Sequence, residues 1–575
     1  LPLQVTPENE AIATGAAQLV DARGNSLRYQ FTRYNRGSGF TGVRNTVTHT
    51  HNIKGWKLNN VFMYSAVDAT ADKGYFLRPT IDISRQFPRL KNYTLGLNYS
   101  VEHNEIHNRF SDSVSFQSFS FENFQASIKS DGSKLNRWGV IYFTRTNAYP
   151  LGKELATSDR SHNVNVFAEL LKNERHQFRF NGTYRTLSIL NDKVTTQRPD
   201  NSLLGRAEYL VNEWRGLLTG NVLYEVGAGQ EQKRDFAYLE VPAGQGEYTW
   251  IDYNNDGIQQ LNEFEVALFQ DQAKYIRIFT PTNQFVKANY NTFNYTVGLN
   301  PRSVINMAEA KPFMKLLANL NLQSSLQLNK KELAKGIVQF NPFKAPLNDT
   351  SLITLNSIFI NTLSFNRFSP KWGFDINNSR NTSKSLLTYG YESRKLDEWN
   401  LRGRWNITRM FMLELSGKTG INQLISSNPK FDNRNFKIDQ YSIEPRFTFT
   451  KGASFRAMVG YKYADKKNQT GSQEKSLSNS ILSEVKYNIL QSTSIQARFT
   501  YNNITFSSLD ATPNTNSPSS YIILDGLLPG KNFLWNLDLT KRLSNNLEMN
   551  IQYEGRKPGT SRMVHIGRAA IRALL

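Results

Sequence analysis

Residues Tyr93 to Glu102 read Tyr-Thr-Leu-Gly-Leu-Asn-Tyr-Ser-Val-Glu, in which large apolar residues alternate with small or polar ones. Successive side chains of a β-strand point to opposite faces, so a period of two places Leu95, Leu97 and Tyr99 on one face. The other face receives Thr94 and Asn98 with their small or polar neighbours. The stretch therefore predicts an amphipathic β-strand.

The same alternation recurs along the chain, in residues 176–184, 401–407, 453–463, 495–501, 532–540 and 547–554. It is regular from about residue 436 onward and is lost between about 300 and 400. The 575 residues contain no Pro-rich or Ser-rich linker, which favours one large architecture. We expect an all-β fold, a single large antiparallel transmembrane β-barrel over residues 1–575. Allowing about 20–24 residues for each strand and its connection gives about 24–26 strands.

The connections between the expected strands fall into two length classes. Residues 172–174, 451–452 and 543–546 are typical of tight hairpin turns. Long polar connections are expected at about residues 188–202, 241–266, 329–350, 421–435, 464–475 and 507–530. Short turns on one side and long loops on the other are the outer-membrane pattern, which predicts periplasmic turns and extracellular loops.

Composition limits the class of protein. The chain has no cysteine, so disulfides and thiolate metal sites are excluded. Mean hydropathy is −0.51 and no long apolar run is present, which argues against a transmembrane helix. Leu1 does not begin a secretory signal, so a membrane location requires a mature chain or a piece of a longer one.

The formal net charge of +21 raises the question of nucleic acid. The basic residues do not gather into arms or one helix, and no nucleic-acid-binding motif is present, so we expect no nucleic-acid partner. In an outer membrane the excess would suit lipopolysaccharide phosphates or a cationic lumen. Soluble alternatives are a β-sandwich array, a propeller or a solenoid. A propeller would need a repeat of roughly 40–50 residues, and none is visible.

The sharpest local motif runs from Asp252 to Glu263 and matches the twelve-residue calcium loop. Oxygen ligands stand at positions 1, 3, 5, 7, 9 and 12 of that loop, namely Asp252, Asn254, Asp256, the Ile258 carbonyl, Gln260 and Glu263. Gly257 occupies position 6, where the chain must turn sharply. Residues 246–250 are expected to be extended, and only 263–273 could be helical. The motif predicts a structural Ca²⁺ in an extracellular loop, with an accidental match as the alternative.

Other candidate chemistry is sparse. His49 and His51 share a strand face, and His103 and His107 flank Glu105, but neither pair has zincin spacing, so exposed polar positions are the simpler interpretation. No nucleophile elbow or phosphate-binding loop is present, and we expect no enzyme. Six basic residues occupy polar strand positions: Arg179, Arg402, Arg404, Arg456, Lys462 and Arg498. In a barrel they would face the lumen, either lining an anion-favouring path or pairing with lumenal carboxylates such as those of Glu414 and Asp538.

Residues 248–285 read YTWIDYNNDGIQQLNEFEVALFQDQAKYIRIFTPTNQF. Together with Asn- and Tyr-rich strands throughout, this segment resembles large outer-membrane β-barrel proteins of Bacteroidota. The resemblance implies location in the outer membrane of a Gram-negative cell, and a native protein with a further N-terminal periplasmic part.

Barrel size bears on function. Residues 1–70 already have strand patterning, for example at 26–31, so the plug domain of a TonB-dependent transporter is not expected within this chain. About 26 strands exceed the 16–18 of solute porins. We therefore expect a role in export or assembly of macromolecules (surface proteins, lipoproteins or lipopolysaccharide) with lipoprotein or assembly-factor partners. The alternatives are a passive or substrate-specific pore, and a structural scaffold or adhesin.

Overall fold

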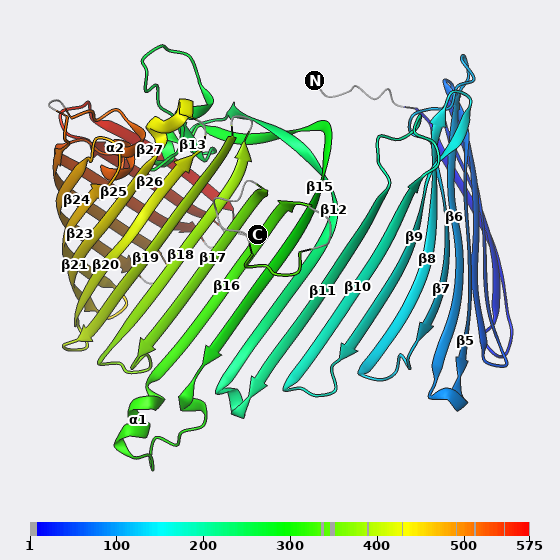
Figure 1. Ribbon diagram of the computed structural model, residues 1–575, viewed down its shortest axis with the longest axis horizontal. Coiled ribbons are helices and arrows are strands. Elements are labelled where there is room, and N and C mark those ends of the chain that lie inside the picture. Colours follow the sequence, from blue (N-terminus) through cyan, green and yellow to red (C-terminus); the bar gives the residue numbers. More distant parts are fainter. Residues whose placement is uncertain are drawn as a thin grey trace. The chain divides into compact units, whose positions relative to one another are not determined.

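The computed structural model describes residues 8–334, 339–344, 351–387, 390–427, 429–489, 492–510, 513–544 and 547–573 (Figure 1). Strands dominate, and the predicted all-β class is confirmed. The chain divides into two compact units. Unit 1 contains the described residues up to Leu210 together with Leu223–Gly229, and unit 2 contains Val211–Val222 and the described residues from Gln230 onward. Each unit is described separately.

Unit 1 is a series of antiparallel strands, each paired with its neighbour in the chain from β1 to β10. They are β1 (Glu10–Val20), β2 (Ser26–Arg36), β3 (Phe40–Ile53), β4 (Trp56–Ala69), β5 (Asp72–Phe87), β6 (Tyr93–Asn108), β7 (Phe119–Lys129), β8 (Asn136–Leu151), β9 (Glu154–Leu170), β10 (His176–Ile189) and β11 (Asp200–Glu213), with the 3-10 turn η1 (Pro88–Leu90). β11 and the following strand β12 (Leu218–Glu240) have residues in both units.

Unit 2 repeats the antiparallel pairing from β15 to β27. Its strands are β13 (Tyr248–Trp250), β14 (Phe264–Val266), β15 (Tyr275–Leu299), β16 (Leu320–Leu333), β17 (Leu352–Phe365), β18 (Trp372–Leu387), β19 (Gly390–Asn406), β20 (Phe411–Ser426), β21 (Phe436–Lys451), β22 (Phe455–Asn468), β23 (Lys475–Ile489), β24 (Thr493–Ser507), β25 (Gly530–Ser544), β26 (Leu547–Lys557) and β27 (Val564–Ala573). Its helices are α1 (Pro312–Ala318) and α2 (Pro518–Ile523), with 3-10 turns η2 (Trp214–Gly216), η3 (Leu261–Glu263), η4 (Gln270–Gln272), η5 (Pro301–Ser303) and η6 (Pro429–Arg434).

Within the described residues, 25 strands have ten or more residues, and β13 and β14 have three each. The expected number of about 24–26 is therefore confirmed for the long strands. A transmembrane β-strand needs about 9–11 residues when tilted, so each long strand has enough length. None of the described helices is long and apolar enough to cross a membrane. Closure of the strands into one barrel over residues 1–575 stays a prediction.

Connections in each unit alternate between two ends of the strands, here named the turn end and the loop end. The predicted tight turns at 172–174 and 451–452 fall at the turn end, and 543–546 lies partly outside the described residues. All the predicted long connections fall at the loop end, although 329–350 is described only in part. Several are shorter than expected because paired strands continue into them, as β22 does to Asn468. Residues 300–319 form one long connection at the turn end, in the region where the sequence alternation is lost.

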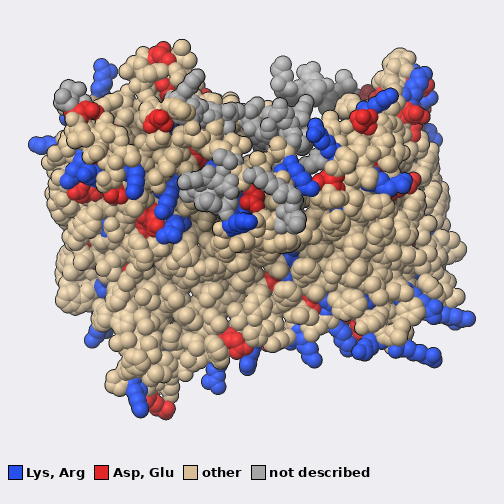
Figure 2. Space-filling model, in the orientation of Figure 1, with Lys and Arg blue, Asp and Glu red and all other residues tan. Residues whose placement is uncertain are grey.

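One face of the strands is apolar and exposed in both units, and is here named the apolar face. In unit 1, Leu97 is 50% exposed and its neighbour across the β6–β7 pair is Ala126, next to the exposed Phe124 and Ile128. In unit 2, Val459 is 58% exposed, and Tyr461 lies opposite the exposed Ile481. On the face drawn in Figure 2, Lys, Arg, Asp and Glu gather toward the strand ends and leave a band with little charge between them. The opposite, polar face carries the charged strand residues.

Candidate functional site

The polar face of unit 2 carries a ladder of ion pairs across β19, β20 and β21. Arg402 lies 2.6 Å from Glu414, whose other oxygen is 3.6 Å from Arg446. One step along the strands, Lys418 pairs with Glu398 at 2.7 Å. Glu414 is only 5% exposed, and a charge this buried is tolerated when it is paired. Charges of both signs on this face indicate that it contacts water.

Strand register places the six predicted basic residues on the polar face. Three of them pair with carboxylates: Arg179 with Glu208, Arg402 with Glu414, and Arg498 with Glu484. Arg404 instead donates to the carbonyls of Arg367 and Ser369 in a turn. Among the described residues, Arg456 and Lys462 make no ion pair. Carboxylate pairing, one of the two alternatives, therefore accounts for half of the set.

Three connections at the loop end of unit 2 fold together, and are here named the cap: residues 241–274, 429–435 and 513–529. The Leu268 amide donates to the Tyr521 hydroxyl at 3.2 Å, and Asn516 donates to the Asp252 carbonyl at 3.2 Å. In Figure 1, β13 and α2 lie at the strand ends opposite α1. The cap thus links segments more than 250 residues apart in sequence.

Apolar side chains hold the cap to the polar face. Leu424, Phe436 and Ile438 pack against Ile523 of α2, and all four are at most 6% exposed. A second cluster joins Ile504, Leu524 and Leu527, with Phe269 packed against it. These strand residues occupy positions that the alternation assigns to the polar face. A signal was present: residues 495–501 carry apolar side chains at odd positions, whereas Ile504 and Phe506 are at even ones.

Four charged residues lie together where the cap meets β19, and two of them, Arg434 and Glu265, are buried. Arg434 Nη2 lies 3.1 Å from Glu265 Oε1, and Arg434 Nη1 lies 3.5 Å from Glu392 Oε2. Glu392 also accepts a 3.0 Å contact from Arg394. Burial raises the pKa of Glu265, and the charges of Arg434 and Arg394 offset only part of that rise. Two positive and two negative charges therefore compensate one another, and the Arg434–Glu265 pair is out of contact with water while the Arg394 side chain is partly exposed.

An exposed edge of the cap is tied to β26 and β27. Asp271 accepts two hydrogen bonds from Arg556, at 2.6 and 2.7 Å, and the Arg556 guanidinium lies 4.5 Å from the Phe269 ring centroid. Arg568 donates to Gln270 at 2.8 Å. Burial alone would raise the pKa of Asp271, but the hydrogen bond and charge of Arg556 outweigh it and hold that pKa below its usual value. The contacts of Arg556 and Arg568 with the cap are here named the latch. Within it, Arg556 and Asp271 form a bidentate pair of two parallel hydrogen bonds.

The predicted calcium loop is the tip of a hairpin in the cap. β13 pairs with β14, with Trp250 opposite Phe264. Residues 248–250 are extended as expected, but residues 263–273 are not helical. They contain β14 and one complete 3-10 turn, η4, because Phe264 stacks on Tyr238 and pairs in the ladder. The range that could have been helical therefore forms no α-helix, and η4 is the helical turn that lies wholly within it.

The candidate ligands are only partly brought together. Asp256 accepts hydrogen bonds from Asn254 and Gln260, and Asp252 accepts one from the amide of Gly257, which has a φ of +71°. Glu263 is 1% exposed and accepts from the Trp250 indole at 2.8 Å. The described residues contain no group of three His, Cys, Asp or Glu side chains placed to hold a metal. Calcium binding stays a prediction.

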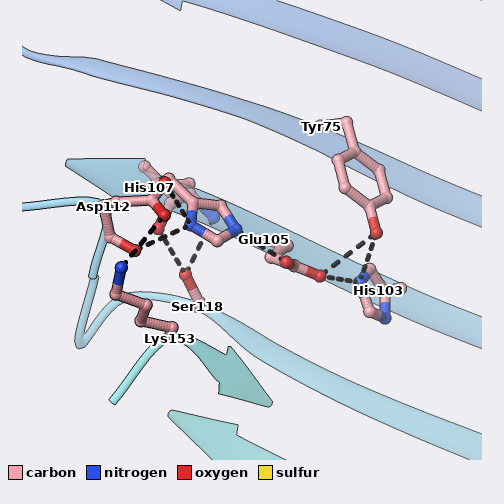
Figure 3. Close-up of polar contacts among 8 residues, drawn as sticks. Tyr75, His103, Glu105, His107, Asp112, Ser118 and Lys153 are labelled. Carbon is pink, nitrogen blue, oxygen red and sulfur yellow. Dashed lines mark hydrogen bonds and ion pairs between the residues drawn. The ribbon is translucent and has the colours of Figure 1, made fainter. Parts of the chain in front are cut away.

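The histidines flanking Glu105 form a hydrogen-bonded cluster at the loop end of unit 1 (Figure 3). Glu105 contacts His103 Nε2 at 2.8 Å through one oxygen and His107 Nε2 at 2.7 Å through the other. The Tyr75 hydroxyl donates to Glu105 at 3.1 Å. These histidines are half-buried rather than exposed, because both rings pack around one carboxylate. The rings of His49 and His51 are stacked, 5.8 Å apart.

No family model and no curated sequence matches this chain. Solved structures with some likeness include the FrpB iron transporter of Neisseria meningitidis, at 8% identity and a TM-score of 0.32, covering 99% of this chain and 82% of that one. The ferric-catecholate import receptor Fiu of E. coli has 9% identity and a TM-score of 0.27, with 99% of this chain and 81% of that one covered. The ferric preacinetobactin receptor BauA of Acinetobacter baumannii has 10% identity and a TM-score of 0.30, with 95% of this chain and 84% of that one covered. Scores of this size do not establish a shared fold, and the proposals below rest on the strands and side chains of this chain.

Proposed function

We propose that the chain is an integral β-barrel protein of the Gram-negative outer membrane. The observation that carries the proposal is the exposed apolar face. Trp405 is 54% exposed, Val459 is 58% exposed, and Phe499 (43%) lies opposite Trp535. Contiguous apolar surface on this scale is unfavourable in water, whereas lipid would cover it. Antiparallel pairing from β1 to β10 and from β15 to β27 also satisfies backbone groups between those strands, as a hydrocarbon environment requires.

The polar face supports a transport role for the barrel. Paired charges such as Arg402–Glu414 stand on it, and a water-filled lumen would solvate them. We propose that cargo moves along this face and that the cap restricts the path at the loop end. The 25 long strands exceed the number in solute porins, which favours export or assembly of macromolecules with partner proteins. A passive or substrate-specific pore is the second candidate, because open polar strands extend from the cap toward the turn end.

Planar-bilayer conductance separates these candidates. If the cap restricts the path, the wild-type protein gives small or rare conductance steps and Arg556→Gln, which breaks the latch, gives larger ones. The matched control is Arg109→Gln, which breaks the exposed pair with Asp68 in unit 1 and leaves the cap untouched. A steady large conductance from the wild type favours the passive pore. Absence of conductance from both proteins after verified insertion favours a scaffold or adhesin.

We also propose that residues 252–263 bind a structural Ca²⁺ in the cap, through Asp252, Asn254, Asp256, the Ile258 carbonyl, Gln260 and Glu263. Support comes from the match to the calcium-loop spacing and from the contacts that bring Asn254, Asp256 and Gln260 together. Bound calcium would stiffen the hairpin tip that contacts Asn516. The basic excess of the chain is proposed to contact lipopolysaccharide phosphates.

A further inference from the structure

The turn end of unit 2 carries an exposed surface that the transport proposal leaves unused. It consists of η2 (Trp214–Gly216), residues 301–318 with η5 and α1, and the turn 366–371, and is here named the platform. η5 packs against both η2 and α1. The Arg302 guanidinium lies 5.0 Å from the Phe368 ring centroid, which joins the turn 366–371 to η5. The three connections therefore form one continuous surface.

Large apolar side chains dominate this surface. The exposed fractions are 59% for Trp214, 45% for Val304, 68% for Phe313, 41% for Met314, 49% for Leu316 and 60% for Phe368. Contiguous exposed apolar side chains of this kind mark interaction sites. Trp, Phe, Met and Arg are also the residues enriched where proteins bind one another.

The charge of the platform specifies its partner. Its connections contain six basic residues, Arg215, Arg302, Lys311, Lys315, Arg367 and Lys371, and two acidic ones, Glu213 at its edge and Glu309. A complementary surface is therefore acidic around an apolar centre. α1 projects beyond the strand ends in Figure 1 instead of lying along the apolar face, so it stands clear of the surface that lipid chains would cover.

The platform is held in shape before any partner binds. Ala318, at the end of α1, is 2% exposed, and the amide of Asn366 donates to the Asn319 carbonyl at 2.9 Å. Pro312 begins the helix at a position where proline fits. A preformed surface loses little conformational entropy on binding.

We propose that the platform docks a protein partner that presents an acidic surface with an apolar centre. The chemistry of the partner is inferred from the platform residues. The inference rests on the proposed membrane function, which places the platform in the periplasm. It gives the partner that export or assembly requires a defined contact site on the chain.

Binding of a designed peptide tests this proposal. The probe is a synthetic helical peptide with Leu on one face and Glu on the other, added to the protein in phosphatidylcholine nanodiscs. We expect saturable binding that weakens at least tenfold in Phe313→Ser/Leu316→Ser and in Arg302→Glu/Lys315→Glu, and that falls with added salt. The matched controls at the loop end of unit 1 are Phe110→Ser, at a side chain 86% exposed, and Lys153→Glu; both should bind as the wild type does.

Equal affinity for all variants, or equal binding to empty nanodiscs, would overturn the proposal. So would co-flotation of the nanodiscs with phosphatidylglycerol vesicles that depends on the same residues, because the surface would then serve lipid. Conductance is measured on every variant in parallel. Lost peptide binding with unchanged conductance isolates the platform, whereas failure of all proteins to insert refutes the membrane function independently of peptide binding.

Discussion

The Asp271 carboxylate receives two hydrogen bonds from the Arg556 guanidinium, across 285 residues of sequence. Asp271 belongs to the cap and Arg556 to β26, so this pair fixes a folded loop to the sheet. Hydrogen bonds to charged groups contribute about 1.5–3 kcal/mol each. A contribution of this size holds residues 241–274 of the cap against β26 and is small enough for the contact to be broken reversibly.

Acidification should release the latch. The Asp271 pKa is lowered in the folded protein from its ordinary value of 3.8. Its contribution to docking is therefore fully present above that ordinary value and is lost as the pH falls through the lowered pKa. We expect the hydrogen-exchange protection of residues 241–274, relative to the intrinsic exchange rate at the same pH, to be constant from neutral pH to about 5 and to fall below about 4. Asp271→Asn should show lower protection than the wild type at neutral pH and no further loss below about 4; a pH response equal to that of the wild type would contradict the assignment.

Removal of the Arg434 charge should destabilise unit 2 strongly. Arg434→Met leaves the carboxylates of Glu265 and Glu392 with less compensation where the cap meets β19. Breaking a buried pair costs about 3–5 kcal/mol in the free energy of unfolding. The double variant Arg434→Met/Glu265→Leu should recover much of this loss, because it also removes the carboxylate of Glu265 that Arg434→Met leaves without its partner. Urea unfolding followed by tryptophan fluorescence measures both, and additive losses would argue against coupling.

Calcium should raise the melting temperature of the wild type and not that of Asp256→Ala. Asp256 is exposed and its hydrogen bonds stay within the loop, so the substitution removes a ligand with little other damage. Glu263→Ala is a poorer probe. The Glu263 carboxylate also accepts a hydrogen bond from the Trp250 indole N–H, so its removal destabilises the cap with or without calcium. Differential scanning calorimetry with calcium or chelator gives the comparison. Identical wild-type melting in both conditions rules out the site.

A lysine on the apolar face should be costly, and one on the polar face should be tolerated. Val459→Lys places a charge among exposed apolar neighbours opposite Phe447. In a membrane the cost is about 2–4 kcal/mol near the midplane. The control Asn550→Lys stands on the polar face of β26, where its cross-strand neighbours are the uncharged Thr540 and Ala570. Folding yield into lipid vesicles and urea midpoints give the difference; equal values would place water on both faces.

Substitution of Gly555 should show how closely the strands are packed beside Trp535. A Cβ at Gly555 would overlap the indole ring, whereas a Cβ at Gly567 meets nothing within 4 Å. Gly555→Val should therefore lower stability by about 1–3 kcal/mol through overpacking. Gly567→Ala should change it little. The same urea midpoints compare them, and a neutral Gly555→Val would show that the ring moves aside freely.

Local patterning was sufficient for the strands. The alternation at Tyr93–Glu102 gave β6, and the same rule gave the paired strands from β21 onward, because side-chain direction in a strand depends only on sequence parity. Loop lengths also placed the long connections at one end. Between residues 300 and 400 the alternation rule did not locate the strands. A strand end that is covered by a loop or extends into water does not need an apolar face, so its sequence does not have to alternate.

The sequence by itself determined the antiparallel strands, their apolar and polar faces, and the ends at which turns and loops lie. Only the tertiary structure decided that Leu424, Phe436 and Ile438 are buried beneath α2, that Asp271 meets Arg556, and that Glu263 turns toward Trp250. Strand patterning is local, so the sequence carries it directly. Cap docking joins residues hundreds of positions apart, and their contact depends on how the folded strands bring the loops together.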